Sequence, residues 1–284
     1  MSKCNLKYST LISALLIFNI FPVANIHAAT PDADAGHAIH WGYTGSAGPV
    51  KWGSISTEYA LCKSGKRQSP VNIRYGEPAE LYSLRFQYQS VPLRVVNNGH
   101  TLQANYDTVK TEDTVSIDGK SYPVHTKPLY NSTLMLGDVP YKLLQFHFHT
   151  PSEHARKGER YAMEVHLVHK NASGNLAVVG VLLKRGAQNP ILQKILNNAS
   201  DQLNKVNTVK NVSVNAADLL PNDHQVFHYS GSLTTPPCSE NVNWFVMKTA
   251  IEVSDSQVDR FVKLIGKNAR PLQGMHWRTM LVSE

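Results

Sequence analysis

The stretch Gln145-Phe146-His147-Phe148-His149 decides how the surrounding chain folds, because its polar and aromatic side chains alternate. A period of two predicts a half-buried β-strand, in which successive side chains point to opposite faces. Phe146 and Phe148 would then enter a core, while His147 and His149 project together from the other face. Two imidazoles on one rigid strand can bind a metal ion with little side-chain freedom left to lose.

A second stretch, residues 164–169 (EVHLVH), follows after a short connection. Its alternation places Glu164 and His166 on one face and His169 on the other, and antiparallel pairing would bring His166 to the first two histidines. Three neutral histidines with an open fourth position are typical of a catalytic zinc site. Each histidine alone is more often an ordinary core or surface residue, so the hypothesis depends on the spacing. Gln145 and Glu164 are suited to orient the imidazoles.

Further strand-like runs recur outward from these stretches, at residues 93–97, 101–106, 142–149, 162–169, 177–183 and 242–249. Two segments show helical spacing instead, at 190–206 and 254–267. The first carries an apolar stripe made of Ile191, Ile195, Ala199 and Leu203. In the second, Ser254 and Gln257 have the spacing of a capping box. The pattern predicts a mainly β fold in a single domain, with a large sheet and peripheral helices.

The composition is that of a globular protein, with 284 residues, 42% hydrophobic and 17% charged. It excludes a coiled coil, a collagen-like fibre and wholesale disorder. The formal net charge is +7, and the densest basic run is only residues 63–67. Charge spread this thinly argues against nucleic-acid binding and favours solubility with mild attraction for anions.

The N-terminus has the pattern of a secretory signal peptide. Lys3 and Lys7 precede an apolar run at 11–21, and small residues follow at Ala28 and Ala29. We therefore predict a signal peptide over residues 1–28 and a mature domain over 29–284, secreted or periplasmic. An uncleaved anchor is the alternative, although the run is short for a membrane span. No other segment is apolar enough to cross a membrane.

Removal of the signal peptide takes away Cys4 and leaves Cys62 and Cys238. An even pair of cysteines in an oxidising compartment favours a disulfide between them. Two free buried thiols are the alternative.

Together these motifs resemble the zinc-binding core of the α-class carbonic anhydrases. The resemblance runs along nearly the whole mature chain, through residues 40–43, 68–73, 97–100, 145–149, 152–154, 164–169, 231–238 and 268–273. It implies a single domain on a large twisted, mostly antiparallel sheet, with one zinc ion per chain. It also implies reversible hydration of CO2 to bicarbonate and a proton by zinc-bound hydroxide, with weak esterase activity as a side reaction. The shortened segment after His149 is similar to bacterial and plant members, and it leaves subunit packing, including a homodimer, open.

The resemblance also implies roles for individual residues. The zinc ligands would be His147, His149 and His166. Thr234 matches the residue that orients the hydroxide and donates its own proton to Glu153. Thr235 matches the residue that contacts bicarbonate.

An apolar wall for CO2 and a route for the released proton follow from the same resemblance. The wall would be Val168, Val178, Leu233 and Trp244, each equally plausible as ordinary core. His100 matches the proton shuttle, a task that suits the pKa of imidazole. Tyr43 and Asn97 match polar residues that order the intervening water.

Two other functions compete with this interpretation. A binding or adhesion module could keep the fold without turnover, but the intact histidine triad, Glu153 and Thr234 argue against it. A zinc hydrolase is the other alternative. A dedicated peptidase usually carries His-Glu-x-x-His, which this chain does not contain.

Overall fold

The computed structural model describes residues 40–106, 114–117, 120–123 and 131–284. The predicted signal peptide, residues 1–28, lies outside these ranges. The described residues from position 40 onward belong to one compact unit. Among them, no helix is long and apolar enough to cross a membrane.

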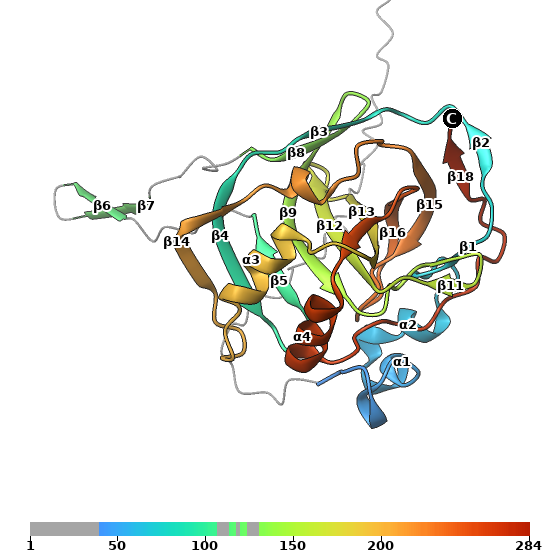
Figure 1. Cartoon of the computed structure of the whole chain (residues 1–284), viewed down its shortest axis with the longest axis horizontal. Coiled ribbons are helices and arrows are strands. Elements are labelled where there is room, and N and C mark those ends of the chain that lie inside the picture. The colour runs from blue at the N-terminus through green and yellow to red at the C-terminus, as the bar shows by residue number, and fades with distance from the viewer. Residues whose placement is uncertain (1–39, 107–113, 118–119, 124–130) are drawn as a thin grey trace, which may run out of the picture. The chain divides into compact units, whose positions relative to one another are not determined.

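A 13-stranded sheet dominates the fold (Figure 1). Its strands are β2 (Glu77–Ala79), β3 (Leu84–Gln87), β4 (Val91–Asn97), β5 (Leu102–Asn105), β8 (Thr133–Leu136), β9 (Val139–His149), β12 (Met163–Asn171), β13 (Leu176–Arg185), β14 (Asn207–Val214), β15 (Val226–Ser232), β16 (Glu240–Met247), β17 (Ile251–Val253) and β18 (Leu281–Ser283). The order across the sheet is β14-β4-β5-β9-β12-β13-β16-β15-β18-β2, and β3, β8 and β17 pair beside this path. Most pairs are antiparallel, and β13 with β16, β13 with β17 and β18 with β2 are parallel. The predicted mainly β fold on a large, mostly antiparallel sheet is confirmed.

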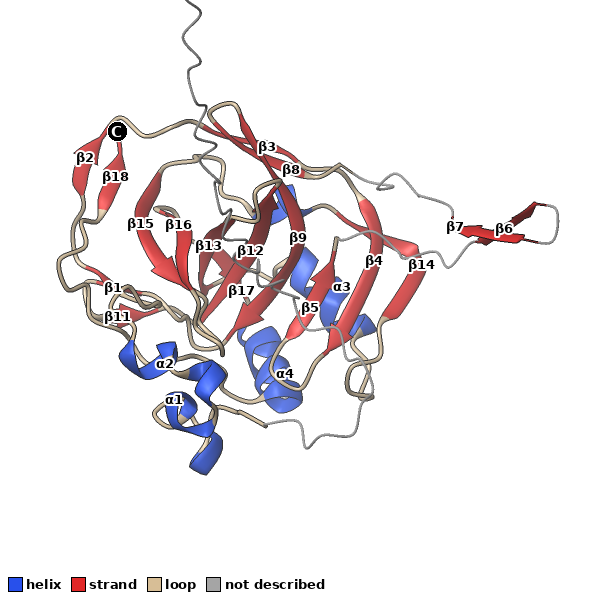
Figure 2. Cartoon of the chain, turned by 180° about the vertical axis from the view of Figure 1, so that it is seen from behind, coloured by secondary structure: helices blue, strands red, loops and turns tan. Residues whose placement is uncertain are grey.

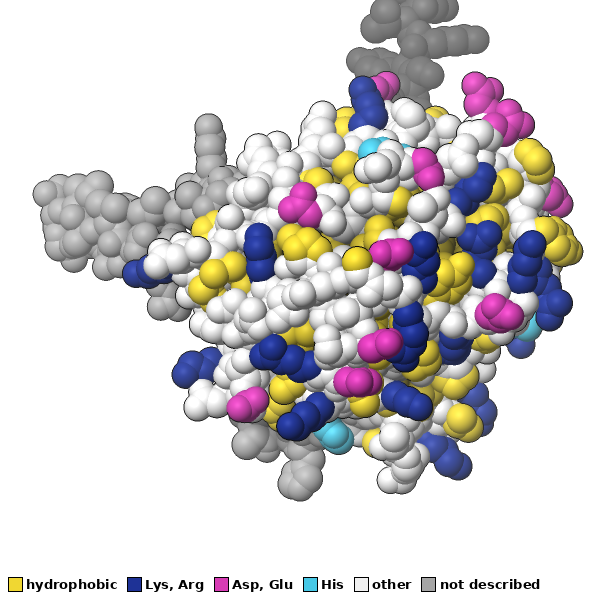
Figure 3. All heavy atoms as spheres, in the orientation of Figure 1, with side chains coloured by type: hydrophobic (Ala, Val, Ile, Leu, Met, Phe, Trp, Pro, Cys, Tyr) yellow, Lys and Arg dark blue, Asp and Glu magenta, His cyan; other side chains and the backbone are white. Residues whose placement is uncertain are grey.

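The remaining elements are short strands and helices around this sheet. The strands are β1 (Asn72–Ile73), β10 (Ala155–Arg156) and β11 (Glu159–Arg160) in one small sheet, and β6 (Thr114–Ile117) and β7 (Lys120–Pro123) in another. The helices are α1 (Trp52–Ile55), α2 (Leu61–Ser64), α3 (Pro190–Asn198) and α4 (Asp255–Ile265), with 3-10 turns η1 (Gly45–Ala47), η2 (Thr57–Tyr59) and η3 (Ala216–Leu219). On the face shown in Figure 3, basic and acidic side chains are interspersed.

The two faces of the central strands bury different sets of side chains. In β12, Val165 and Leu167 join the main hydrophobic core, and β13 adds alternate residues such as Val179. The intervening residues of β13, among them Val178, belong to a second apolar cluster on the opposite face. Helices α3 and α4 pack on the main-core side through apolar residues that include Ile195. This arrangement leaves the second face available for a site (Figure 2).

The two predicted helices are present, but the first is shorter than expected. Helix α3 ends at Asn198 rather than at 206, and Leu203 is 61% exposed beyond it. Asn198 donates its side-chain amide to the carbonyl of Lys194, and Ser200 accepts from the backbone of Gln202. Such short polar side chains compete with helical hydrogen bonds, which explains the early end. Helix α4 begins with the predicted capping box of Ser254 and Gln257.

Candidate metal centre

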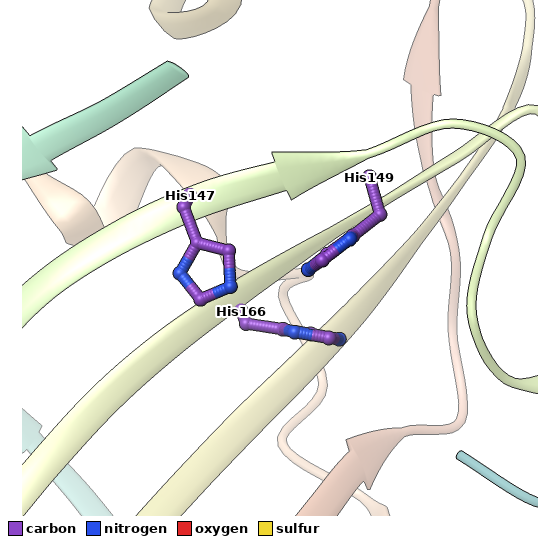
Figure 4. A group of neighbouring side chains, drawn as sticks. All are labelled: His147, His149 and His166. Atoms are coloured by element: carbon purple, nitrogen blue, oxygen red, sulfur yellow. The ribbon is translucent and has the colours of Figure 1, made fainter. Parts of the chain in front are cut away.

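Three histidines converge at the ends of β9 and β12 (Figure 4). The antiparallel register pairs His147 with His166 and His149 with Glu164. The ring centroids of the three histidines lie 4.5 to 5.2 Å apart, and one nitrogen from each lies within 4.8 Å of the others. The alternation of β9 explains the arrangement, since Phe146 enters the main core from the other face.

Each imidazole uses one ring nitrogen to contact an acceptor. Nδ1 of His147 lies 2.8 Å from Oε1 of Gln145, and Nδ1 of His149 lies 2.8 Å from the backbone oxygen of Asn268. Nε2 of His166 lies 3.0 Å from Oε1 of Glu164. Because oxygens of these kinds only accept, the contacting nitrogens must carry the hydrogens. The other three nitrogens therefore present lone pairs toward one point.

Burial keeps the imidazoles of His147 and His149 neutral. Desolvation lowers the pKa of His147 well below its usual value, and the neighbouring His149 and His166 lower it further. The pKa of His149 is also lowered, chiefly by burial. Burial alone would raise the pKa of Glu164, but His154 and His166 beside it hold that pKa well below its usual range. Three imidazole nitrogens beside a charged carboxylate that orients one of the rings are the donor set that zinc prefers.

Two buried polar atoms support the same conclusion. Nε2 of His149 and Oε2 of Glu153 are buried without a hydrogen-bond partner. A buried unpartnered polar atom costs free energy unless something binds it. The His149 nitrogen is one of the three convergent lone pairs, and a metal ion at this point would satisfy it. The residues present thus fit a bound divalent metal.

Glu153 lies directly beside the triad. Its Oε1 accepts a hydrogen bond from the backbone nitrogen of Arg270 at 2.8 Å. Its Oε2 lies 3.5 Å from Nε2 of His149 and 3.9 Å from Nδ1 of His166. The hydrogen bond expected from Thr234 to Glu153 is not formed, because Oε2 faces the imidazoles and has no hydrogen-bond partner.

Thr234 and Thr235 lie in the loop that follows β15. Thr234 is buried, and the backbone oxygen of Thr235 accepts from the nitrogen of Cys238. The carbonyl of Ser232, just before this loop, accepts from the indole of Trp244 at 2.9 Å. The loop is thereby attached to the wall beside the triad.

The four apolar residues expected to contact CO2 do gather on one face. Val178 and Trp244 are buried in the second apolar cluster, and Val168 and Leu233 pack against it partly exposed. The ring of Trp244 lies 4.8 Å from that of His166. An apolar surface therefore adjoins the triad, on the face opposite the main core.

His100 stacks on an aromatic ring. Its imidazole is parallel to the indole of Trp41, with centroids 3.7 Å apart, and His40 lies 6.1 Å away. Burial and the nearby His40 lower the pKa of His100. Burial and the Glu153 carboxylate raise the pKa of Tyr43 well above its usual value, so its phenol keeps its proton.

Asn97 is not brought to the site. It pairs with Leu102, a residue of the main core, and residues paired across two strands share a face. Its Oδ1 instead accepts from the backbone nitrogen of Gly99 in the following turn. Gln103 occupies the metal-facing position on β5, because it pairs with His147. The alternation of residues 101–106 could have revealed this, since Gln103 and Leu102 fall on opposite faces.

Asn268 is a functional residue that sequence reasoning did not single out. Its backbone oxygen orients His149, and its amide donates to the carbonyls of His100 and Phe148, each at 2.9 Å. Its Oδ1 accepts from the nitrogen of Thr150. The separation of 119 residues from His149 leaves no local signal for this contact.

A disulfide joins Cys62 to Cys238, as predicted. It links α2 to the loop that carries Thr234 and Thr235. The buried guanidinium of Arg270 donates to the carbonyl of Cys62 at 3.0 Å, and Gln68 donates to that of Cys238. The loop is thus anchored on both sides of the disulfide.

The large sheet and its three-histidine centre define a class of protein that could bind a metal ion with three imidazoles beside an apolar wall. The sequence profile of the family "Eukaryotic-type carbonic anhydrase" matches residues 47–283. A carbonic anhydrase of Nostoc is 38% identical over 248 residues, covering 86% of each chain, and one of Klebsiella pneumoniae is 39% identical over 86% of this chain and 91% of its own. A hyperthermostable carbonic anhydrase from a hydrothermal vent chimney superposes with a TM-score of 0.75 at 39% identity, covering 86% of this chain and all of the other. The chain belongs to the α-class carbonic anhydrases, enzymes that hydrate CO2, and the resemblance seen in the sequence is confirmed.

Proposed function

We propose that the protein hydrates CO2 reversibly to bicarbonate and a proton with one zinc ion held by His147, His149 and His166. The observation that carries the proposal is the convergence of three imidazole lone pairs, each left free by a hydrogen bond on the other side of its ring. When bound, zinc supplies the Lewis acidity that lowers the pKa of water toward neutrality.

Glu153 and Thr234 orient the attacking oxygen. The backbone of Arg270 holds Oε1 of Glu153, so its Oε2 is available to accept from the Thr234 hydroxyl. That hydroxyl then accepts a hydrogen bond from the nucleophile and aims its lone pair at carbon. The backbone nitrogen of Thr234 would stabilise negative charge on the substrate oxygen.

The apolar wall of Val168, Val178, Leu233 and Trp244 receives CO2, which has no charge to pair with. Thr235, one residue beyond the orienting threonine, contacts the bicarbonate product. The same centre would hydrolyse activated esters slowly as a side reaction.

His100 passes the released proton to solvent. It is half-buried, as a group that moves protons between site and buffer must be. Tyr43, a protonated phenol near Glu153, and Gln103, opposite His147, order the water between. The disulfide between Cys62 and Cys238 supports an oxidising compartment, so we propose that the mature enzyme is secreted or periplasmic.

Stopped-flow CO2 hydration tests this function. The mature protein is assayed as purified, after removal of metal by a chelator, and after addition of one equivalent of zinc. We expect activity to disappear and return. Zinc retained at one per chain without hydration would contradict the proposal and favour a binding module.

A further inference from the structure

Behind His166 lies a second cluster of polar side chains that the reaction does not use. Oε1 of Glu164 contacts His166 and also Nδ1 of His154 at 2.7 Å, while Oε2 accepts from the backbone nitrogen of His154 at 2.8 Å. On the far side, Nε2 of His154 lies 2.7 Å from the hydroxyl of Tyr229, which lies 2.8 Å from Oγ of Ser69. These five side chains are all at most 1% exposed.

The direction of each hydrogen bond follows from the groups themselves. The carboxylate of Glu164 only accepts, so both imidazoles that contact it must donate. In the neutral form with its hydrogen on Nδ1, His154 has a lone pair on Nε2 that accepts from the Tyr229 hydroxyl. The Tyr229 oxygen then accepts from Ser69. The chain of hydrogen bonds therefore has one polarity, from Ser69 to the carboxylate that orients His166.

The far end of this chain is tied to the loop of the proposed catalytic threonine. The backbone nitrogen of Ser69 donates to Oγ of Ser232 at 2.9 Å, and the nitrogen of Ser232 donates to Oγ of Ser69 at 3.1 Å. Ser232 lies two residues before Thr234. One connected set of buried hydrogen bonds therefore reaches from this loop to a metal ligand.

Two glycines leave the space that the cluster occupies. A Cβ at Gly180, which pairs with His166, would lie 2.9 Å from Oε1 of Glu164. A Cβ at Gly231 would lie 2.2 Å from Oγ of Ser69. Glycine on the neighbouring strands thus leaves room for the Glu164 carboxylate and the Ser69 hydroxyl, and a larger residue at either position would displace the cluster.

We propose that Tyr229 is a positioning residue for the metal ligand His166, acting through His154 and Glu164. Its hydroxyl contacts Nε2 of His154 and holds that ring in place, so that Nδ1 of His154 stays against Glu164, and Glu164 then fixes the ring of His166 with Nδ1 toward the metal. Without the hydroxyl, Nε2 of His154 would be buried with no partner, and the ring would be free to shift and weaken its hydrogen bond to Glu164. This role rests on the proposed metal site.

Zinc dissociation from Tyr229→Phe tests the proposal. Tyr106→Phe is the matched control, because Tyr106 is also buried, and its hydroxyl donates to the carbonyl of Val214 and accepts from the nitrogen of Ala216. Each zinc-loaded protein is mixed with excess chelator, and zinc release is followed over time alongside urea unfolding. Loss of a partner that orients a metal-bound histidine typically weakens metal binding by 10- to 100-fold.

We expect zinc release about tenfold faster in Tyr229→Phe and unchanged in Tyr106→Phe, while both lose similar stability. The visible spectrum of the cobalt-loaded protein should change only in Tyr229→Phe. Equal release rates in the two variants and the wild type would overturn the proposal, as would equal acceleration in both variants.

If Tyr229→Phe does not fold, His154→Asn tests the same link from its other side. The asparagine amide can donate to Glu164 where Nδ1 of His154 does, but it does not reach the Tyr229 hydroxyl, so zinc release should again accelerate. An unchanged release rate would overturn the proposal. Failure of the wild type to retain zinc would instead contradict the proposed function, which separates the two results.

Discussion

At the scale of single residues, the acceptor on one side of an imidazole decides which nitrogen is free on the other. Gln145, Glu164 and the carbonyl of Asn268 each accept a hydrogen bond from one histidine of the triad. Burial adds to this by keeping His147 and His149 uncharged. The geometry of the candidate metal site is therefore set by the groups behind the three imidazoles as much as by the imidazoles themselves.

Replacement of His147 by alanine removes one of three lone pairs. We expect His147→Ala to lose zinc and CO2 hydration together, because two imidazoles cannot hold the ion in a three-histidine site. Zinc content by atomic absorption and stopped-flow hydration measure the two effects. His224→Ala, at an exposed histidine, is the control. Normal turnover in His147→Ala would refute the ligand assignment.

His169 makes stability depend on pH. Burial lowers its pKa to about 4, while its Nε2 lies 2.6 Å from the hydroxyl of Tyr88. Since the unfolded histidine has a pKa near 6.5, the unfolded state takes up a proton first as pH falls. The stability that His169 contributes is fully present above about pH 6.5, and about 3 kcal/mol of it is lost as the pH falls to 4.

Urea unfolding of the metal-free wild type and His169→Gln between pH 7.5 and 4.5 measures this contribution. His147 and His149 add a dependence of the same sign, so the comparison uses the difference between the two proteins. The variant should lose less stability on acidification. Parallel curves would show that His169 does not contribute.

At the scale of elements, strand alternation separates the face with the candidate metal site from the face that packs into the main core. β9 and β12 send alternate residues to the histidine cluster and to the main core, and α3 and α4 cover the main core. Changes in those helices should therefore affect stability without affecting chemistry. Helix α4 offers a direct test, because its start depends on one side chain.

Ser254→Ala removes the cap of α4, whose hydroxyl accepts from the nitrogen of Gln257. We expect a loss of about 1 kcal/mol in the free energy of unfolding, with kcat/KM for CO2 unchanged. Asp259→Ala, inside the same helix and exposed, is the control and should stay within about 0.5 kcal/mol of wild type. Equal losses in both variants would argue against the capping role.

At the scale of the whole molecule, one covalent link connects distant parts of the chain. The cysteines of the disulfide are 176 positions apart, and the bond holds the Thr234 loop against α2. Chain-entropy models give such a long loop roughly 5 kcal/mol of stabilisation. The proposed metal ligands lie on β9 and β12, which the bond does not join.

The variant Cys62→Ser/Cys238→Ser should therefore retain one zinc per chain but unfold at a lower temperature. Its kcat/KM should fall, because Thr234 and Thr235 lose their anchor at Cys238. Calorimetry, zinc analysis and stopped-flow hydration measure the three quantities. An unchanged kcat/KM in the folded variant would show that the loop keeps its geometry without the bond.

Local sequence pattern alone was sufficient to predict the strands, the side of the sheet on which His147, His149 and His166 lie, and the cap of α4. The direction of a side chain in a strand depends only on its position along that strand, so a short window of sequence carries it. The same pattern placed the end of α3 too late, because helical spacing continued through polar residues that end the helix. The resemblance assigned Asn97 to the water network of the site, but its strand register places it on the main-core face of the sheet.

Contacts between distant residues were decided only in the folded chain. The carbonyl of Asn268 beside His149, the backbone of Arg270 on Glu153 and the approach of Tyr229 to His154 join residues 75 to 119 positions apart. Packing of whole strands and loops sets these distances, and no local periodicity records them. The sequence was thus sufficient to propose the three histidine ligands and the orienting side chains of Gln145 and Glu164. The contacts of Asn268, Arg270 and Tyr229 required the tertiary structure.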